Sequence, residues 1–117
     1  MHYPIVPVPK PRMTRRDVWA KRPCVLRYRA FKDAVRDHRV ILPECGGSIT
    51  FYLAMPKYWS KKKKETMNGQ GHQQVPDLDN LLKALSDAVH LDDSKIWMFR
   101  RVQKLWSYKP GITIEVE

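Results

Sequence analysis

The sequence contains little of what marks secreted, zinc-binding and membrane proteins. Its two cysteines, Cys24 and Cys45, stand in no CxxC or Cys/His spacing, which argues against a zinc site and favours free thiols. No apolar run approaches the roughly 20 residues that a membrane span needs. The first residues, MHYPIVPVPKPR, also lack the uninterrupted apolar region of a signal peptide. We therefore expect a cytoplasmic protein that does not engage a membrane.

Acidic residues are scarce as well. The chain has 12 Asp and Glu residues against 22 Lys and Arg residues, a net charge of +10. A surplus of this size attracts polyanions, so nucleic acid is the expected partner, and a merely solvated basic surface is the alternative. The 117 residues are enough for one small domain with a single core, which we expect to span residues 1–117.

Positive charge concentrates in two tracts. The first is a basic arm over residues 10–23, where Pro11 and Pro23 prevent a continuous helix. The second lies in a polar, lysine-rich loop over residues 57–75, which we expect to be mobile and to close on phosphates. The residues expected to contact DNA are Lys10, Arg12, Arg15, Arg16, Arg22, Lys61, Lys62, Lys63 and Lys64. The alternative is that both tracts only aid solubility.

Apolar periodicity predicts an α+β domain, a small mixed sheet with two packed helices in the order β-α-β-α-β-β. The expected elements are an edge strand within residues 3–8, a helix over 26–41, a strand over 48–55, a helix within 78–89, and strands over 95–108 and 112–116. In the run 95–108, the aromatic residues Trp97, Phe99 and Trp106 fall on both alternating faces. One face should then leave the core, and a partner subunit is the expected cover.

The stretch from Pro76 to Ile96 places carboxylates at both ends of an amphipathic helix. Its apolar stripe is Leu78, Leu81, Leu82, Leu85, Ala88 and Val89, and the opposite face carries Asn80, Lys83, Asp87 and His90. If the segment before the helix is extended, Asp77 and Asp79 point to the same side. Lys83 follows Asp79 by four residues and shares its helical face. Several hard oxygen ligands together suit Mg²⁺ or Mn²⁺, whereas the alternative is ordinary helix caps and surface acids.

The runs PDLDNLLKALSDAV and LDDSKI resemble the signature of the RusA family of Holliday-junction resolvases, many of which are encoded by phages and prophages. The matching residues are Asp77, Asp79, Asn80, Lys83, Asp92 and Asp93. The resemblance implies a RusA-like fold in which Asp77, Asp79 and Asp93 ligate the catalytic metal, Mg²⁺ or Mn²⁺ in its place. It also implies that Lys83 is the essential lysine. Asn80 and Asp92 are the expected supporting residues.

The resemblance implies an enzyme that resolves four-way DNA junctions by paired, Mg²⁺-dependent phosphodiester hydrolysis in recombination and repair. Because a four-way junction is two-fold symmetric and is cut in two strands, the expected assembly is a homodimer in a bacterial or phage-infected cell. Two alternatives remain open. One is a basic DNA-binding module without catalysis, and the other is a nuclease that prefers flaps or forks.

Overall fold

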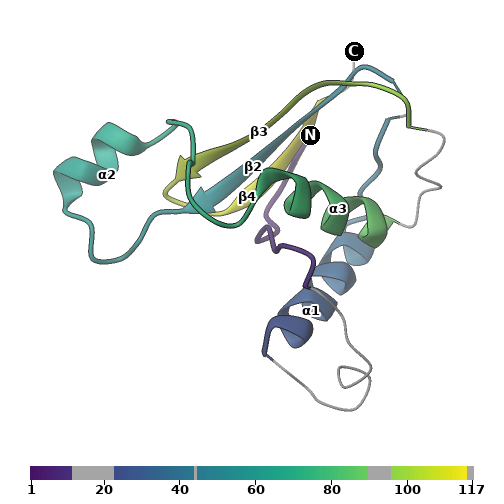
Figure 1. Ribbon diagram of the computed structural model, residues 1–117, viewed down its shortest axis with the longest axis horizontal. Coiled ribbons are helices and arrows are strands. Elements are labelled where there is room, and N and C mark those ends of the chain that lie inside the picture. Colours follow the sequence, from purple (N-terminus) through teal and green to yellow (C-terminus); the bar gives the residue numbers. More distant parts are fainter. Residues whose placement is uncertain (12–22, 44, 90–95, 116–117) are drawn as a thin grey trace.

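The computed structural model describes residues 1–11, 23–43, 45–89 and 96–115. Three helices and a four-stranded sheet make up this part of the chain (Figure 1). In chain order the elements are β1 (His2–Tyr3), α1 (Pro23–Asp37), β2 (Gly47–Ala54), α2 (Lys61–Met67), α3 (Leu78–Val89), β3 (Phe99–Ser107) and β4 (Gly111–Glu115). The α+β prediction is confirmed, and α2 is an additional helix.

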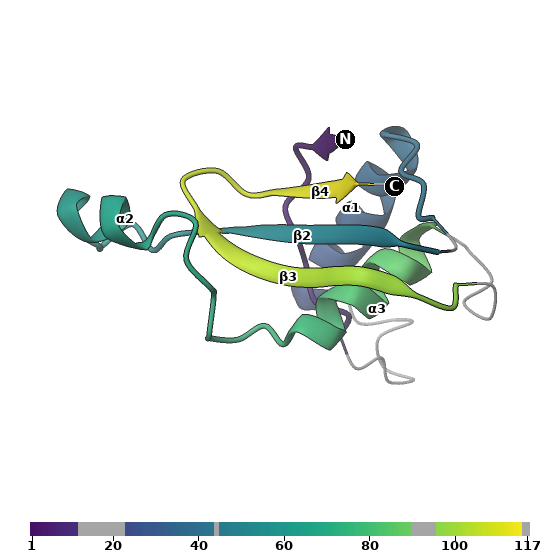
Figure 2. The same cartoon turned by 90° about the horizontal axis from the view of Figure 1, so that it is seen from above.

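The sheet is mixed, with the strand order β1-β4-β2-β3. Strands β2 and β3 are parallel, whereas β4 is antiparallel to both β2 and β1. Helices α1 and α3 lie on the same face of the sheet, and α2 projects beyond its end (Figures 1 and 2). Since parallel strands need a long connection, the chain between β2 and β3 crosses back over the sheet and carries α2 and α3 on the way.

The core lies between the sheet and these two helices. The predicted alternation of β2 is confirmed, because Ile49, Phe51 and Leu53 are buried while the residues between them are more exposed. The predicted stripe of α3 is confirmed too, with Leu81 and Leu85 fully buried. Both residues belong to one cluster with side chains of α1 and β4. Burial of this continuous apolar surface fixes α3 against the sheet.

Strand β3 differs from its prediction in one way that affects the aromatic residues. Its pairing with β2 contains an irregularity, because Gly47 pairs with Phe99 and Ser48 pairs with Arg101. The extra residue in β3 reverses the alternation, so that both Phe99 and Val102 pack against the core. The prediction that strand alternation forces an aromatic face out of the core is therefore wrong for Phe99 and Trp106. Trp97 precedes the strand and is 72% exposed.

Helix α1 ends at Asp37, four residues before the predicted end. Arg39 adopts a positive φ of 52°, and the chain closes in a Schellman motif. In this motif Val40 N–H donates to the Val35 carbonyl at 3.3 Å, and Arg39 N–H donates to the Arg36 carbonyl at 3.1 Å. His38 lies just beyond the helix and is exposed.

The segment predicted to be an irregular loop contains helix α2. Ser60 caps this helix, because its hydroxyl accepts a hydrogen bond from Lys63 N–H at 3.1 Å. The helix has no buried residue of its own. It is attached through Trp59, whose ring lies 4.7 Å from that of Trp106. The expectation of a loop was wrong here because the helix depends on a cap and on helix-forming lysines, not on an apolar stripe.

After α2 the chain pairs with the outer edge of β3. Gly69 N–H donates to the Trp106 carbonyl, and Trp106 N–H donates to the Gln70 carbonyl, both at 2.9 Å. His72 N–H then donates to the Lys104 carbonyl at 3.0 Å. This short antiparallel pairing covers the β3 edge and leads the chain directly to the start of α3.

Two smaller predictions concern the cysteines and membrane spans. Cys24 and Cys45 are both free, as expected. Among the described residues, no helix combines the length and apolar character needed to span a membrane.

Candidate active site

The acidic motif lies at the N-terminus of α3. Asp77 immediately precedes the helix, and its carbonyl accepts a hydrogen bond from Leu81 N–H at 3.2 Å. Asp79 is already in the first turn. The two carboxylates therefore do not lie on one extended segment. The prediction that an extended segment points them to the same side is wrong, because Asp79 belongs to the helix. The positive end of the helix dipole favours carboxylates at this position.

The predicted pairing of Lys83 with Asp79 is present. The Lys83 ammonium lies 3.8 Å from an Asp79 carboxylate oxygen, and both side chains are about two-thirds exposed at 66% and 69%. An ion pair this exposed contributes little free energy, so Lys83 can leave Asp79 for another anion at small cost. Asn80 lies one residue after Asp79 and is half-buried.

A cleft of about 510 Å³ opens beside Asp77. Its walls come from the N-terminal segment, from the loop before α3 and from β2, and its lining residues are Pro7, Pro9, Lys10, Leu53, Val75, Pro76, Asp77 and Asn80. Most of them are apolar, whereas Lys10, Asp77 and Asn80 supply the polar groups. The first acid of the motif thus lies in a concave surface.

The carboxylates of Asp77 and Asp79 are hard oxygen donors, which is the ligand chemistry that Mg²⁺ and Mn²⁺ prefer. Among the described residues, no three His, Cys, Asp or Glu side chains gather closely enough to hold a metal ion. Asp92 and Asp93, which the motif predicts as a supporting residue and the third ligand, lie outside the described residues. Asp77 and Asp79 therefore offer the type of ligand that a divalent cation prefers, but they supply two of the three predicted carboxylates.

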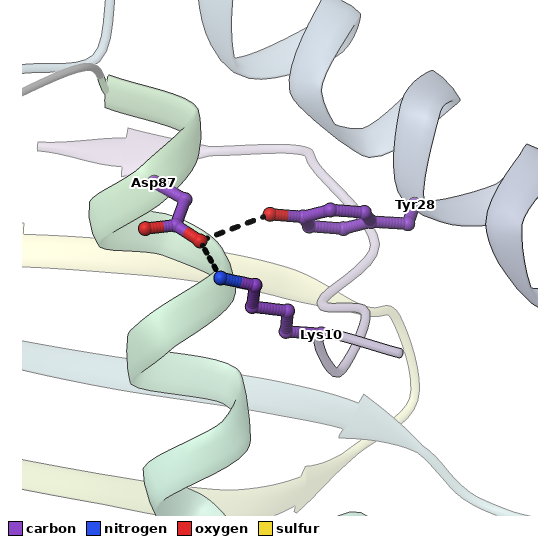
Figure 3. A network of polar contacts seen from close by, with 3 residues as sticks. All are labelled: Lys10, Tyr28 and Asp87. Atoms are coloured by element: carbon purple, nitrogen blue, oxygen red, sulfur yellow. Dashed lines mark hydrogen bonds and ion pairs between the residues drawn. The ribbon is translucent and has the colours of Figure 1, made fainter. Parts of the chain in front are cut away.

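Lys10 is predicted from the sequence to contact DNA as part of the basic arm. In the structure its side chain is already paired beside the cleft. Its ammonium forms an ion pair with Asp87 on α3, which also accepts a hydrogen bond from the Tyr28 hydroxyl of α1 at 3.3 Å (Figure 3). Lys10 N–H donates to the Asn80 carbonyl at 3.4 Å. The N-terminal segment, α1 and α3 therefore meet at one carboxylate. Asp87 was predicted only as part of the polar face of α3.

The other predicted DNA contacts divide into two groups. Lys61, Lys62, Lys63 and Lys64 lie along α2, where the first three are exposed, and Lys63 lies over the Trp59 ring at 4.4 Å from its centroid. Arg12, Arg15, Arg16 and Arg22 lie outside the described residues. Helix α2 thus carries four consecutive lysines on a projection from the sheet (Figure 2).

Sequence reasoning missed Lys104. Its ammonium donates hydrogen bonds to the backbone carbonyls of Gln74 and Pro76, at 2.5 Å and 2.7 Å. The nearby His72 ring is buried against Trp106, and its Nδ1 has no hydrogen-bond partner in the part of the chain that the structure describes. Burial lowers the pKa of His72, and the charge of Lys104 lowers it further. The sequence signal that could have identified it is its position, because Lys104 lies between Val102 and Trp106 in a strand row that faces the core.

Comparison with protein families gives one informative result. The family model described as "Endodeoxyribonuclease RusA" matches residues 3–117. Neither the curated proteins nor the solved structures give a match. The matched region includes every residue of the acidic motif.

The junction of Lys10, Tyr28 and Asp87 makes a measurable prediction. The pKa of Tyr28 is raised from 10.0 to about 12, mainly by burial and further by the charge and the hydrogen bond of Asp87. We expect Asp87→Asn to lower the pKa of Tyr28 while leaving it above 10.0, because burial persists. Nuclear magnetic resonance of ¹³C-labelled tyrosine measures this value directly.

The exposed Asp33→Asn in α1 is the control and should leave the Tyr28 pKa unchanged. Since the unfolded tyrosine ionises first, wild-type stability should fall as the pH rises from about 10 to about 12. An unchanged Tyr28 pKa in Asp87→Asn would contradict the described contact.

Proposed function

This chain belongs to the RusA family of endodeoxyribonucleases, and on that premise we propose that it resolves four-way DNA junctions by Mg²⁺-dependent hydrolysis of paired phosphodiester bonds. The observation that carries the proposal is the position of the motif: Asp77 lines a cleft at the N-terminus of α3, two residues before Asp79, which pairs with Lys83. Anionic ligands and substrate phosphates are both favoured at a helix N-terminus.

The carboxylates of Asp77, Asp79 and Asp93 would hold the divalent cation. When bound, Mg²⁺ or Mn²⁺ supplies Lewis-acid polarisation of the scissile phosphate and of the attacking water. Asp79 lies on a helix whose apolar stripe is buried in the core, and Asp77 immediately precedes that helix, so the backbone of both residues is held in place. Asp92 would support the ligand set from outside it, and Asn80 would orient a ligand carboxylate.

Lys83 would stabilise the charge that develops on the phosphate. Its ammonium rests on Asp79 at 3.8 Å and is largely exposed. Lys83 would then leave Asp79 and donate to a phosphate oxygen, because an Asp79 carboxylate that held a cation would attract the ammonium less. The lysine then acts where charge increases during the reaction, which is where a charged donor affects the rate most.

Positive charge away from the acids would bind the DNA backbone. Lys61, Lys62, Lys63 and Lys64 on α2 would contact phosphates, as would Arg12, Arg15, Arg16 and Arg22 of the basic arm. Lys10 has a different role in this proposal, because its ammonium is paired with Asp87. It anchors the N-terminal wall of the cleft to α3.

Paired cleavage implies two active sites related by two-fold symmetry, so we propose a homodimer. Its substrate would arise in DNA recombination and repair, in the cytoplasm of a bacterial or phage-infected cell. Sedimentation at the assay concentration should give a dimer, and a monomer that makes paired cuts would contradict this. A nuclease that prefers flaps or forks would use the same residues, and a panel of branched substrates separates the two.

We expect Asp79→Asn to abolish cleavage of a four-way junction while binding stays equal or becomes tighter. Removal of a negative charge near phosphate cannot weaken electrostatic attraction, whereas loss of a metal ligand stops the chemistry. Single-turnover cleavage and gel-shift titration measure the two effects. The control is Asp33→Asn, which should retain the wild-type rate. Cleavage by Asp79→Asn at a near wild-type rate would overturn the assignment.

Lys83→Ala should slow cleavage at saturating DNA with little change in Kd. One phosphate contact among many contributes little to binding, whereas a charge at the reacting phosphate acts on kcat. Lys57→Ala removes another exposed lysine and serves as the control, with kcat unchanged. A loss confined to affinity would reduce Lys83 to a backbone contact.

Replacing Lys61, Lys62, Lys63 and Lys64 by Gln should weaken binding to all DNA structures and reduce its salt dependence. Each lost phosphate contact lowers the slope of log affinity against log salt by about 0.9 for duplex DNA. Glutamine is a good helix former, so α2 should persist. Glu65→Gln on the same helix is the control and should not weaken binding. An unchanged slope would show that α2 does not meet phosphate.

A further inference from the structure

Lys104 occupies an unusual place in the sheet. On the core-facing side of β3 it lies between Val102 and Trp106, and it pairs with Phe51, which is fully buried. A partly buried ammonium in such a row is costly unless its protons are hydrogen-bonded. The contacts of Lys104 show what compensates that cost.

Three hydrogen bonds join Lys104 to the chain that enters α3. Its carbonyl accepts from His72 N–H at 3.0 Å, and its ammonium donates to the carbonyls of Gln74 and Pro76 at 2.5 Å and 2.7 Å. The last of these carbonyls belongs to the residue before Asp77. A single residue of β3 therefore fixes the connection between the sheet edge and the acidic motif.

The backbone of Asp77 is consequently held from both sides. Before it, the Pro76 carbonyl is bound by Lys104, and after it, the Asp77 carbonyl accepts from Leu81 N–H at 3.2 Å. With both flanking peptides fixed, the direction in which the Asp77 side chain leaves the backbone is fixed as well. Val75 and Pro76, which line the cleft, are held by the same contacts.

We propose that Lys104 is a positioning residue of the active site, acting on Asp77 through the backbone carbonyls of Gln74 and Pro76. This inference rests on the proposed function, because it takes Asp77 as a metal ligand. Lys104 need not touch DNA or the metal. Its contribution is the geometry of the ligand, and a misplacement of about 1 Å in such a group can cost about 100-fold in rate.

The charge of Lys104 allows geometry to be separated from electrostatics. If Lys104 acts only as a nearby positive charge, its removal should strengthen the binding of a cation at the acids. If it positions Asp77, its removal should weaken cation binding, although the site becomes less positive. The two roles predict changes of opposite sign.

The experiment measures Mn²⁺ binding to the DNA-free protein by the electron paramagnetic resonance signal of free Mn²⁺. Lys104→Met keeps the apolar stem and removes the ammonium, and we expect it to weaken Mn²⁺ affinity by about 10-fold or more. Lys104→Arg keeps the charge and the donors, so it should restore part of the affinity. The control is Lys109→Met in the neighbouring β3–β4 turn, which removes the same charge and should not weaken binding.

If Lys104→Met does not fold, Lys104→Gln carries the same test, since it also removes the charge but keeps a donor. Mn²⁺ affinity equal to or tighter than that of the wild type, in a folded variant, would overturn the proposal. A wild-type protein that binds Mn²⁺ but cuts no DNA would instead refute the proposed function. The Mn²⁺ affinities of the wild type and the Lys104 variants could still be compared in that case. A wild-type protein that does not bind Mn²⁺ would refute both.

With a four-way junction at saturating concentration, Lys104→Met should also lower kcat by roughly 10- to 100-fold at unchanged Kd. A loss of affinity at unchanged kcat would identify Lys104 as a DNA contact and overturn the positioning role.

Discussion

The parallel pairing of β2 and β3 is the constraint on which the rest of the structure depends. Parallel neighbours cannot be joined by a tight turn, so the chain must leave the sheet at Ala54 and return at Phe99. That long connection holds α2, the segment paired with the β3 edge, and α3 with its acids. Because α3 buries Leu81 and Leu85 against the sheet, the return path places Asp77 at a defined point beside the cleft. The connection between β2 and β3 thereby gives the acidic motif a fixed position in the fold.

Charge is distributed unevenly over this frame. The protein carries a net charge of +10, yet the N-terminus of α3 presents two carboxylates. A second polar centre forms where Asp87 meets Lys10 and Tyr28. Meanwhile α2 presents four lysines on a projection. A basic molecule attracts a polyanion over long range, and a local acidic site on it offers oxygen donors to a cation. The arrangement agrees with membership of a DNA endonuclease family.

Much of the fold could be predicted from the sequence, because its signals are local. The alternation of β2 and the stripe of α3 follow from periodicity, and the Asp79–Lys83 pair follows from a spacing of four residues. Three features had no such signal. The Schellman end of α1 uses Arg39 where glycine is usual, the irregularity at Arg100 reverses the alternation of β3, and α2 lacks an apolar stripe. Lys104 could not be assigned because its partners are backbone carbonyls 28 and 30 residues away.

The central claim is that the acids at α3 cut branched DNA. The most direct measurement is strand cleavage of a synthetic four-way junction by the purified wild-type protein, with Mg²⁺ and with a chelator, beside a linear duplex of the same sequence. The account predicts paired, symmetric cuts in the junction that require Mg²⁺, while the duplex stays intact. Tight binding of the junction without cleavage in Mg²⁺, or equal cleavage of the duplex, would contradict it.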